Sequence, residues 1–361
     1  MTARRWVAPA PSPMAPPPSM PPTLPLYGVT VAQLTDALHS RTRALAALRA
    51  LHAAPPTARV PETLTGVSRV VWQAARAGFH VPAWRVVRRD AADDGTIKYA
   101  MAFGGAGDDQ AVETVWIPGR ARATVCVSSQ VGCTRACTFC ATAAIGFRRN
   151  LTADEIVLQY LLAAHDARGL PRNVVFMGMG EPMDNLDQVL AAIRVLTGAP
   201  TPLLGAEHIT VSTSGIGPGM ERFLRESEVG FALSLNGTTD EQRARIMPQT
   251  LRWPLAELFR IMHADAVVHP RRRYFMEYVM LDGVNDHDAD ADRLPALLAG
   301  LRAHVNLIPH NPFPGNPLRA SSLATVQRFR DRLHGHGVRA LVRTPRGQDI
   351  AAACGQLARQ H

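Results

Sequence analysis

Three cysteines lie close together in the chain, at Cys133, Cys137 and Cys140, in the spacing C-x3-C-x2-C. This spacing can wrap three thiolates around one compact inorganic centre such as a 4Fe-4S cluster. With three protein ligands one iron stays open, and it could bind the amino and carboxylate groups of S-adenosylmethionine (SAM) beside a source of electrons. The alternative is a zinc site, which usually has four protein ligands and would here need a distant fourth.

A glycine-rich turn follows the apolar run VVFMG. Gly178 and Gly180 would let the backbone approach a ligand, and the next residue, Glu181, could accept a hydrogen bond from an ammonium group. Such a turn more often simply connects two secondary-structure elements. Because the three cysteines precede it, we interpret Gly180 and Glu181 as SAM-binding residues.

Polar residues also stand at the ends of later apolar runs, where ligands bind in sheets built from parallel strands. Serine at such a position usually caps a helix, and asparagine before proline usually forms a turn. With a cofactor nearby, the same groups could bind its ribose or carboxylate. The candidates are Ser212, Ser234, Leu235, Asn236 and Asn311.

Two further cysteines and one glutamate have ordinary interpretations when they are considered alone. Cys126 could be a small buried residue on a strand, and Cys354 an incidental thiol near the C-terminal end of the sequence. Glu113 could be a solvated glutamate on a strand. Their spacing assigns none of them a chemical role.

Together, however, the motifs resemble the radical SAM methyltransferases that modify carbon 2 of adenine in ribosomal RNA, and the related adenine-8 enzymes that confer antibiotic resistance. The resemblance covers roughly residues 108–357. It rests on VETVWIP, RATVCVSSQVGCTRACTFCAT, RNLTADEI, VVFMGMGEPMDN, HITVSTSG, EYVMLDGVND, VNLIPHNPFPG and RGQDIAAACGQLA.

The resemblance implies a division of labour among these residues. Cys354 would be methylated by one SAM, and a second SAM, cleaved at the cluster, would provide the radical that activates this methyl group. Glu113 would accept the ring proton, and Cys126 would release the product by forming a disulfide with Cys354. The resemblance thus implies one 4Fe-4S cluster, two SAM per turnover, an electron donor such as flavodoxin or ferredoxin, and a thiol reductant.

The elements that would position these residues alternate from about residue 111 onward, as in βα units around a parallel sheet. Thr152 and Glu155 predict a capping box at the start of the helix after the cysteines. We therefore predict an α/β fold, a partial (β/α)6 radical SAM barrel with a small N-terminal extension. The predicted strands are 123–130, 173–178, 208–213, 230–235, 273–281, 304–309 and 338–343.

Four segments follow from this pattern. Residues 1–26 are rich in proline and are predicted to be disordered. Residues 27–110 would form a small accessory domain with a helical stretch at 28–54, residues 111–345 the barrel, and residues 346–361 the segment that carries Cys354. No apolar run approaches the ~20 residues needed to span a bilayer, so we expect a cytoplasmic protein, and we expect it to be a monomer.

The formal net charge of +9, with arginine in excess, fits a polyanionic partner but could merely reflect a soluble surface. The resemblance implies that the partner is ribosomal RNA, with transfer RNA as a further candidate. Arginine suits phosphate oxygens, and a solvated basic face is the alternative for each residue. The phosphate-contact candidates are Arg148, Arg149, Arg271, Arg272 and Arg273.

The sequence departs from the family pattern in several places. Asn236, Ala143 and Thr250 replace the usual histidine, glycine and asparagine, and the FRAxQ-type segment of the N-terminal RNA-recognition region is not found. Two other functions stay open at this point. A radical SAM enzyme with another substrate would not need Cys126 and Cys354 as a pair, and a non-catalytic RNA-binding protein would contain only a structural metal.

Overall fold

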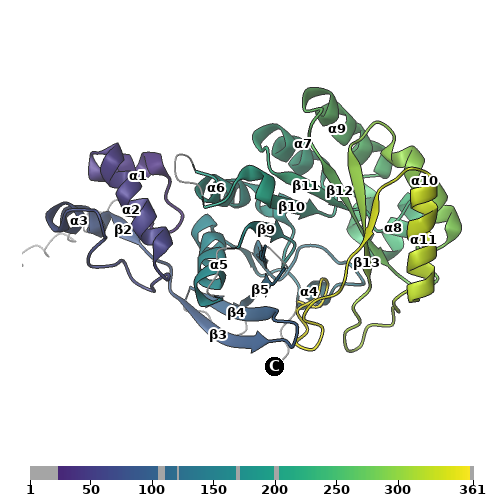
Figure 1. Ribbon diagram of the computed structural model, residues 1–361, viewed down its shortest axis with the longest axis horizontal. Coiled ribbons are helices and arrows are strands. Elements are labelled where there is room, and N and C mark those ends of the chain that lie inside the picture. The colour runs from purple at the N-terminus through teal and green to yellow at the C-terminus, as the bar shows by residue number, and fades with distance from the viewer. Residues whose placement is uncertain (1–22, 105–109, 120–121, 168–170, 199–202, 358–361) are drawn as a thin grey trace, which may run out of the picture.

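A computed structural model describes residues 23–104, 110–119, 122–167, 171–198 and 203–357 (Figure 1). Its centre is one ten-stranded sheet. Three antiparallel strands begin it, β3 (Trp84–Ala91), β4 (Ile97–Phe103) and β5 (Val112–Ile117), and seven parallel strands follow them. In sheet order the parallel strands are β6 (Thr124–Cys126), β9 (Asn173–Phe176), β10 (Ile209–Thr213), β11 (Gly230–Ser234), β12 (Tyr274–Met280), β13 (Ala303–Pro309) and β14 (Ala340–Val342).

The seven predicted strands are all present and all run parallel, so the α/β fold class is confirmed. The parallel part has one strand more than the six predicted for the barrel. The first strand, β6, pairs with β9 on one side and with antiparallel β5 on the other. Pairing between β4 and β5 continues the same sheet across residue 110, where the accessory domain was predicted to end.

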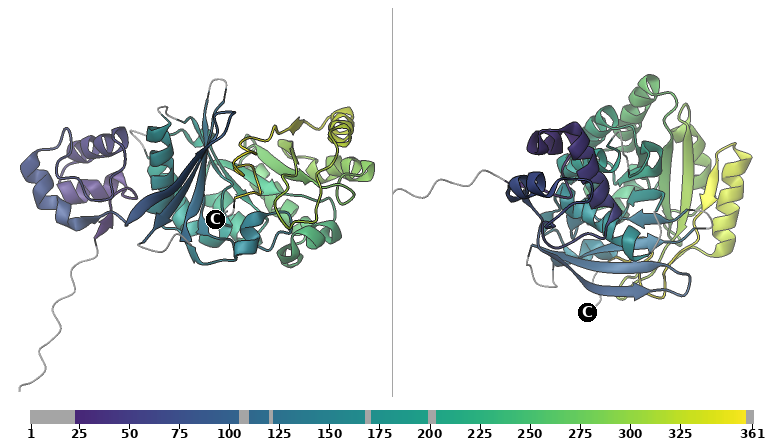
Figure 2. Two further views of the ribbon diagram at one scale, coloured as in Figure 1. Left: turned by 90° about the horizontal axis from the view of Figure 1, so that it is seen from below. Right: turned by 60° about the vertical axis from the view of Figure 1, so that its left-hand side comes forward.

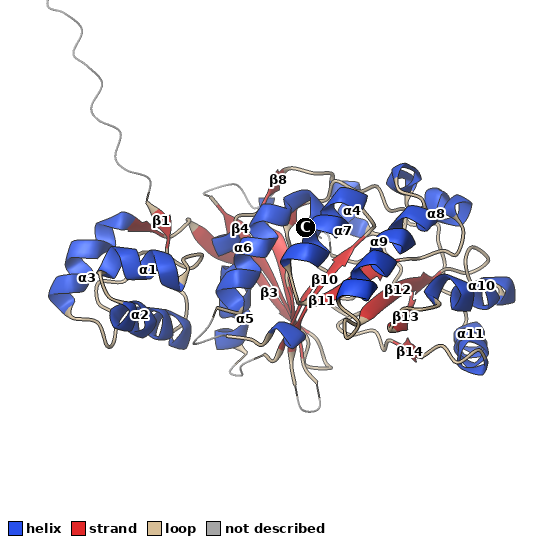
Figure 3. Cartoon of the chain, turned by 90° about the horizontal axis from the view of Figure 1, so that it is seen from above, coloured by secondary structure: helices blue, strands red, loops and turns tan. Residues whose placement is uncertain are grey.

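Helices connect the parallel strands and lie along the outside of the sheet (Figures 1 and 3). The backbone N–H of Thr152 donates to the Glu155 carboxylate at 2.9 Å, which confirms the predicted capping box. The helices are α5 (Ala153–Asp166), α6 (Leu186–Leu196), α7 (Gly217–Glu226), α8 (Asp240–Ile246), α9 (Leu255–Val268), α10 (Asp288–Leu298) and α11 (Leu323–Gly335), with short 3-10 turns at Pro182–Asn185, Ala206–His208 and Pro248–Arg252. None of the helices in the described residues is long and apolar enough to cross a membrane.

A small helical unit stands at the antiparallel end of the sheet (Figure 2). It contains α1 (Val31–Leu38), α2 (Arg41–Ala53), α3 (Arg69–Ala75) and a 3-10 turn at Arg76–Gly78. The stretch predicted to be helical at 28–54 is therefore two helices. They are separated at His39, whose left-handed backbone (φ 50°) ends α1, and at Ser40, whose hydroxyl caps α2.

The predicted disordered tail falls mostly on residues 1–22, which lie outside the described residues. Its last residues are ordered, and the prediction is wrong there. The strand β1 (Leu24–Pro25) pairs with β2 (Phe79–His80), and Leu26 is fully buried. Burial of apolar side chains against the helical unit outweighs the conformational freedom that proline-rich flanks suggest.

Candidate active site

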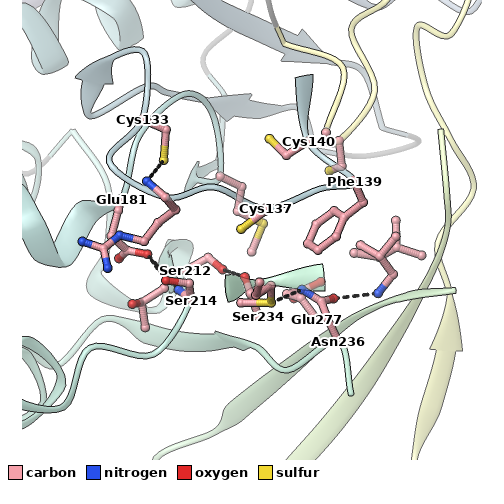
Figure 4. Close-up of a pocket in the computed structure, with 18 of the residues that line it drawn as sticks. Cys133, Cys137, Phe139, Cys140, Glu181, Ser212, Ser214, Ser234, Asn236 and Glu277 are labelled. Carbon is pink, nitrogen blue, oxygen red and sulfur yellow. Dashed lines mark hydrogen bonds between the residues drawn. The ribbon is translucent and has the colours of Figure 1, made fainter. Parts of the chain in front are cut away.

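A pocket of about 920 Å³ lies at the carboxyl ends of the parallel strands, where polar groups from several strands can converge. The cysteine loop between β6 and α4 (Ala141–Ile145) forms one wall of this cofactor pocket. Figure 4 shows the three cysteines on the opposite side of the pocket from Ser212 and Ser234. The sequence-predicted residues in its lining are Cys133, Cys137, Cys140, Gly180, Glu181, Ser212, Ser234, Asn236, Asn311 and Cys354.

The cysteine loop is braced by a small two-stranded sheet, β7 (Gln130–Val131) with β8 (Arg149–Asn150). Within the loop the Arg135 N–H donates to Cys133 Sγ at 3.3 Å. Burial raises the pKa of the Cys133 thiol to about 12, and burial together with the other two thiols raises the pKa of Cys137. These thiols are therefore protonated without a cation, and a bound iron would have to displace the protons.

Three soft thiol donors on one wall, facing polar strand ends, suit an iron–sulfur cluster with an open iron. Within the described parts of the chain, these three thiols do not form a group that could hold a single metal ion. A 4Fe-4S cluster does not require this, because each thiolate binds a different iron of the cluster.

The Gly180–Glu181 turn packs against the segment between β6 and β7. Gly180 has a φ of +104°, and a Cβ there would lie 2.7 Å from the Gln130 nitrogen. Glycine is therefore required by packing inside the protein as well as by backbone conformation. The buried Glu181 carboxylate accepts hydrogen bonds at 2.8 Å from both the N–H and the hydroxyl of Ser214, so its orientation is fixed before a ligand binds.

Burial raises the pKa of the Glu181 carboxyl, while its hydrogen bonds with Ser214, Met183 and Thr213 act in the opposite direction. Arg135 also lines this pocket, but its guanidinium group pairs with Asp184. A ligand ammonium group could therefore supply a positive charge to the Glu181 carboxylate.

The serine candidates meet across two neighbouring strands. Ser212 at the end of β10 and Ser234 at the end of β11 have hydroxyl oxygens 3.2 Å apart, and both face the pocket (Figure 4). Leu235 differs from its neighbours. It is fully buried and does not line the pocket, and its carbonyl accepts from the buried guanidinium of Arg243 at 3.0 Å. The structure thus places Ser212 and Ser234 in the pocket, but not Leu235.

Asn236 lines the pocket but uses its side chain within the protein. Its backbone is left-handed (φ 53°), a conformation that asparagine tolerates better than most residues. Its Oδ1 accepts from the Val279 N–H at 2.8 Å, and its Nδ2 donates to Met247 Sδ at 3.3 Å. Asn236 therefore ties the end of β11 to β12.

Cys354 stands between the cofactor pocket and a second pocket of about 1380 Å³, which we call the thiol pocket because Cys126 also lines it. Met177, Glu277, Ile308, Asn311 and Cys354 line both. Both cysteines are free thiols. Cys354 is accessible to solvent within the pockets, yet the surrounding protein raises its pKa; Cys126 is fully enclosed, and burial raises its pKa.

The segment with Cys354 is anchored directly to the cluster loop. The Ala141 N–H donates to the Gly355 carbonyl at 2.7 Å, and the Thr142 hydroxyl donates to the Leu357 carbonyl. Asn311 Nδ2 donates to the Cys354 carbonyl at 3.1 Å. The segment that carries Cys354 is therefore tied to the start of α4, directly after the cysteine loop.

Glu113 lines neither pocket. It lies on β5, buried, with its Oε1 3.0 Å from the Lys98 ammonium. Residues directly opposite each other in neighbouring strands share a face, and Val115 pairs with Cys126. Glu113, two residues before Val115, is therefore on the Cys126 face of the sheet, beyond the thiol pocket.

The predicted phosphate contacts lie in different surroundings. Arg272 is wrong: its side chain is only 6% exposed and its Nε lies 2.9 Å from Asp265, so it stabilises the loop before β12. Arg149 pairs with Glu155 at 2.8 Å, whereas Arg148 and Arg271 are exposed. Arg273 lines a third, basic pocket at the opposite end of the strands from the cofactor pocket.

This basic pocket collects arginines that immediately precede three neighbouring strands. Arg273 precedes β12, Arg302 precedes β13 and Arg339 precedes β14. Burial and these three guanidinium groups lower the pKa of His304. The described residues show no ion pair between any of the three arginines and a carboxylate, so their charge is available to an anion.

Several residues of the site were missed by the sequence analysis. Glu277 is the most important, because it lines both pockets and its carboxylate accepts from Asn306 Nδ2 at 2.7 Å. A glutamate in the middle of the apolar strand YFMEYVM was a signal that could have identified it. Ser214 and Arg243 carried no comparable signal, because their roles depend on contacts between strands.

The chain is similar to known proteins over most of its length. Residues 127–294 match the family model described as the radical SAM superfamily. A probable RNA methyltransferase of Sorangium cellulosum is 46% identical over 81% of this chain and 73% of its own. The dual-specificity RNA methyltransferase RlmN of Halorhodospira halophila is 43% identical over 82% of each chain.

A solved structure agrees with these relatives. A radical SAM methyltransferase from Sphaerobacter thermophilus superimposes with a TM-score of 0.84 and 38% identity, over 92% of this chain and 99% of its own. Membership of the radical SAM superfamily implies a 4Fe-4S cluster and SAM, and the thiols of the cofactor pocket suit them. The chain therefore belongs to the RlmN family of radical SAM RNA methyltransferases.

Proposed function

We propose that this enzyme methylates carbon 2 of an adenine in ribosomal RNA, with transfer RNA as a second substrate class, by way of a methyl group carried on Cys354. One observation carries the proposal. Cys354 lines both the cofactor pocket and the thiol pocket, so one sulfur can face the cofactor on one side and Cys126 on the other.

The cofactors would be held by residues that line the cofactor pocket. Cys133, Cys137 and Cys140 would each bind one iron of a single 4Fe-4S cluster. Glu181 is aligned to accept from the ammonium group of SAM, and Ser212 and Ser234 offer hydroxyl groups to the rest of the molecule. Asn236 and Asn311 would contact SAM from the pocket lining, with side-chain amides that are held in place by bonds within the protein. When bound, the reduced cluster supplies the electron that cleaves SAM to an organic radical.

A sulfur carrier has a chemical reason. Carbon 2 of adenine is neither acidic nor nucleophilic enough to take a methyl group directly from SAM, whereas a thiolate is. Cys354 would lose its proton and take the methyl group of a first SAM. A second SAM, cleaved to the radical, would remove one hydrogen atom from that methyl group, and the carbon radical would add to the ring.

Release of the product would use the two groups beyond the carrier. Glu113 would take the proton from the modified ring carbon, and the surplus electron would pass to a one-electron acceptor of the iron–sulfur class. Cys126 would then attack the sulfur of Cys354. The S–S bond forms, the C–S bond breaks with its electron pair going to carbon, and that carbon takes up a proton.

The same scheme defines the partners. A thiol reductant must supply two electrons to reopen the disulfide, and a donor such as flavodoxin or ferredoxin must reduce the cluster. We propose that the enzyme acts as a monomer in the cytoplasm. The RNA would be held through its phosphates by exposed arginines, including Arg148, Arg271 and the three arginines of the basic pocket.

Nucleoside mass spectrometry tests the proposal. Purified enzyme with reconstituted cluster, SAM, reductant and ribosomal RNA should produce 2-methyladenosine. Cys354→Ala should still cleave SAM without methylating RNA, and Cys126→Ala should trap a covalent protein–RNA adduct. Formation of 8-methyladenosine instead would assign the enzyme to the adenine-8 chemistry, and methylated RNA from the Cys354 variant would refute the carrier.

A further inference from the structure

A lysine buried behind the thiol pocket connects two parts of the proposed machinery. Lys98 lies on β4, and its Nζ is 3.0 Å from Glu113 Oε1 and 3.2 Å from the backbone carbonyl oxygen of Ala351. Lys98 pairs with Val115, and Val115 pairs with Cys126, so Lys98 and Cys126 share one face of the sheet. One ammonium group thus contacts both the proposed base and the segment that carries Cys354.

The burial of this pair calls for an explanation. The side chain of Lys98 is 7% exposed and that of Glu113 is 5% exposed. Removing two charges from water is costly, and well-packed apolar residues often stabilise a protein equally well. Stability alone therefore does not explain the pair, whereas a carboxylate that must stay ionised inside the protein does require a cation.

The Ala351 contact belongs to a wider attachment of the C-terminal segment to the β3–β4 hairpin. At the hairpin tip the Gly347 N–H donates to Asp94 Oδ2, and the Asp93 N–H donates to Asp349 Oδ2, each at 3.2 Å. Ala351 itself has a left-handed backbone with φ of 52°, which is costly for alanine and must be stabilised by its surroundings. Lys98 provides the deepest of these attachments.

We propose that Lys98 is a positioning residue that holds Glu113 and the Cys354 segment in register. The inference rests on the proposed function, because it gives Lys98 a role only if Glu113 accepts a proton from the ring that Cys354 has attacked. The two contacts of Lys98 fix the distance between the proton acceptor and the carrier segment. It makes no contact with the thiols of the cluster loop among the described interactions.

The proton transfer itself should alter this arrangement. When the ring proton moves to the Glu113 carboxylate, the electron pair of the C–H bond stays in the ring and the carboxyl becomes neutral. Its Coulombic attraction to Lys98 is then much weaker, while the contact of Lys98 with the Ala351 carbonyl remains. Until that moment the ion pair holds the base charged and correctly oriented.

The test compares three variants of the full-length holoenzyme. Lys98→Gln removes the charge, and Lys98→Arg keeps it with donors that can reach both partners. Arg272→Gln is the matched control, because Arg272 and Asp265 form an equally buried pair, 6% exposed on each side and 2.9 Å apart, before the start of β12. Each variant is assayed for S-methylation of Cys354, for the covalent RNA adduct and for release of methylated RNA.

Lys98→Gln should methylate Cys354 within about twofold of the wild-type rate, accumulate the adduct and release product about 10- to 100-fold more slowly, since a positioned base commonly contributes a factor of that order or more. The KM for RNA should change little, and Lys98→Arg should recover most of the release rate. Product release from Lys98→Gln at the wild-type rate would overturn the inference. Equal losses in S-methylation, adduct formation and release, as expected from a general structural defect and as measured in Arg272→Gln, would overturn it as well.

If Lys98→Gln fails to fold, Lys98→Arg still tests the inference. An arginine variant that folds and methylates Cys354, but neither releases product nor accumulates the adduct, would contradict it. The adduct trapped by Cys126→Ala separates this inference from the proposed function. If that adduct forms but Lys98→Gln behaves as wild type, only the role of Lys98 is refuted. If neither adduct nor S-methylcysteine forms in any variant, the proposed function and this inference both fall.

Discussion

The side-chain amide of Asn311 donates to the carbonyl oxygen of Cys354 at 3.1 Å and accepts from Gln348 Nε2 at 2.9 Å. A single side chain at the end of β13 therefore holds the C-terminal segment at two points, on either side of the turn that contains Ala351. A side-chain amide offers a donor and an acceptor together, whereas a carboxylate offers acceptors alone. This relationship makes the position of Cys354 depend on one asparagine.

Asn311→Asp should displace the carrier, because the new carboxylate cannot donate to the Cys354 carbonyl. Leaving such a group unpaired costs about 1–3 kcal/mol, which corresponds to about a 5- to 150-fold loss in the rate of Cys354 methylation. Mass spectrometry of the peptide containing Cys354 measures this rate. Asn173→Asp, at the amino end of β9, serves as control, and equal rates in the two variants would contradict the assignment.

Gly180→Ala should abolish cofactor binding, because the added Cβ would lie 2.7 Å from the Gln130 nitrogen in a backbone conformation that alanine avoids. Gly315→Ala is a control with a similar strain, since Gly315 also has positive φ (+80°) but has open space around its Cβ. Iron content and calorimetric titration with SAM compare the two. Normal SAM affinity in Gly180→Ala would show that the turn does not shape the pocket.

The basic pocket should make a measurable electrostatic contribution to RNA binding. Replacing Arg273, Arg302 and Arg339 by glutamine should reduce the dependence of log K on log salt concentration by about 2, since each phosphate contact to a single strand contributes about 0.7. Fluorescence anisotropy with a labelled ribosomal RNA fragment gives the slope. The comparison is a double variant, Arg222→Gln with Arg260→Gln, because these two arginines are exposed but paired with carboxylates. An unchanged slope in the triple variant would exclude this pocket from RNA binding.

Stability should decrease in mildly acidic solution because of His52. Burial and the nearby His165 lower its pKa from 6.5 to about 4 in the folded protein. As the pH falls, His52 therefore takes up a proton in the unfolded chain before it does so in the folded protein. The free energy of unfolding is unaffected by His52 above pH 6.5 and decreases as the pH falls toward 4. The loss is at most about 3 kcal/mol. Urea unfolding of wild type and His52→Gln at pH 7.5 and 5 should show a smaller pH effect in the variant, and identical effects would rule it out.

The sequence was most informative where chemistry is carried by residue type and spacing. The C-x3-C-x2-C loop, the strand endings at Ser212 and Ser234, and the alternation of the βα units all depend on local patterns. The structure brings these residues to one pocket, as the parallel arrangement of their strands predicted. The capping box at Thr152 and Glu155 was predictable for the same local reason.

Other features depend on contacts between distant segments and could not be predicted in this way. Arg272 resembles its exposed neighbours in sequence, yet it pairs with Asp265 on α9 and is buried. Leu235 follows Ser234 but points into the core, because successive residues of a strand face opposite sides. The link from Lys98 to Ala351 joins residues 253 positions apart, a separation that no local pattern encodes.

The position of Cys354 between the two pockets would also determine how the reactive intermediates of the proposed mechanism move. Because Cys354 lines both pockets, a carbon fragment attached to its sulfur could move from the cofactor pocket to the thiol pocket without diffusing through bulk water. The nucleobase and the cofactor then need not occupy the same space at the same time. This partition would protect the fragment from quenching and impose a direction on the transfer.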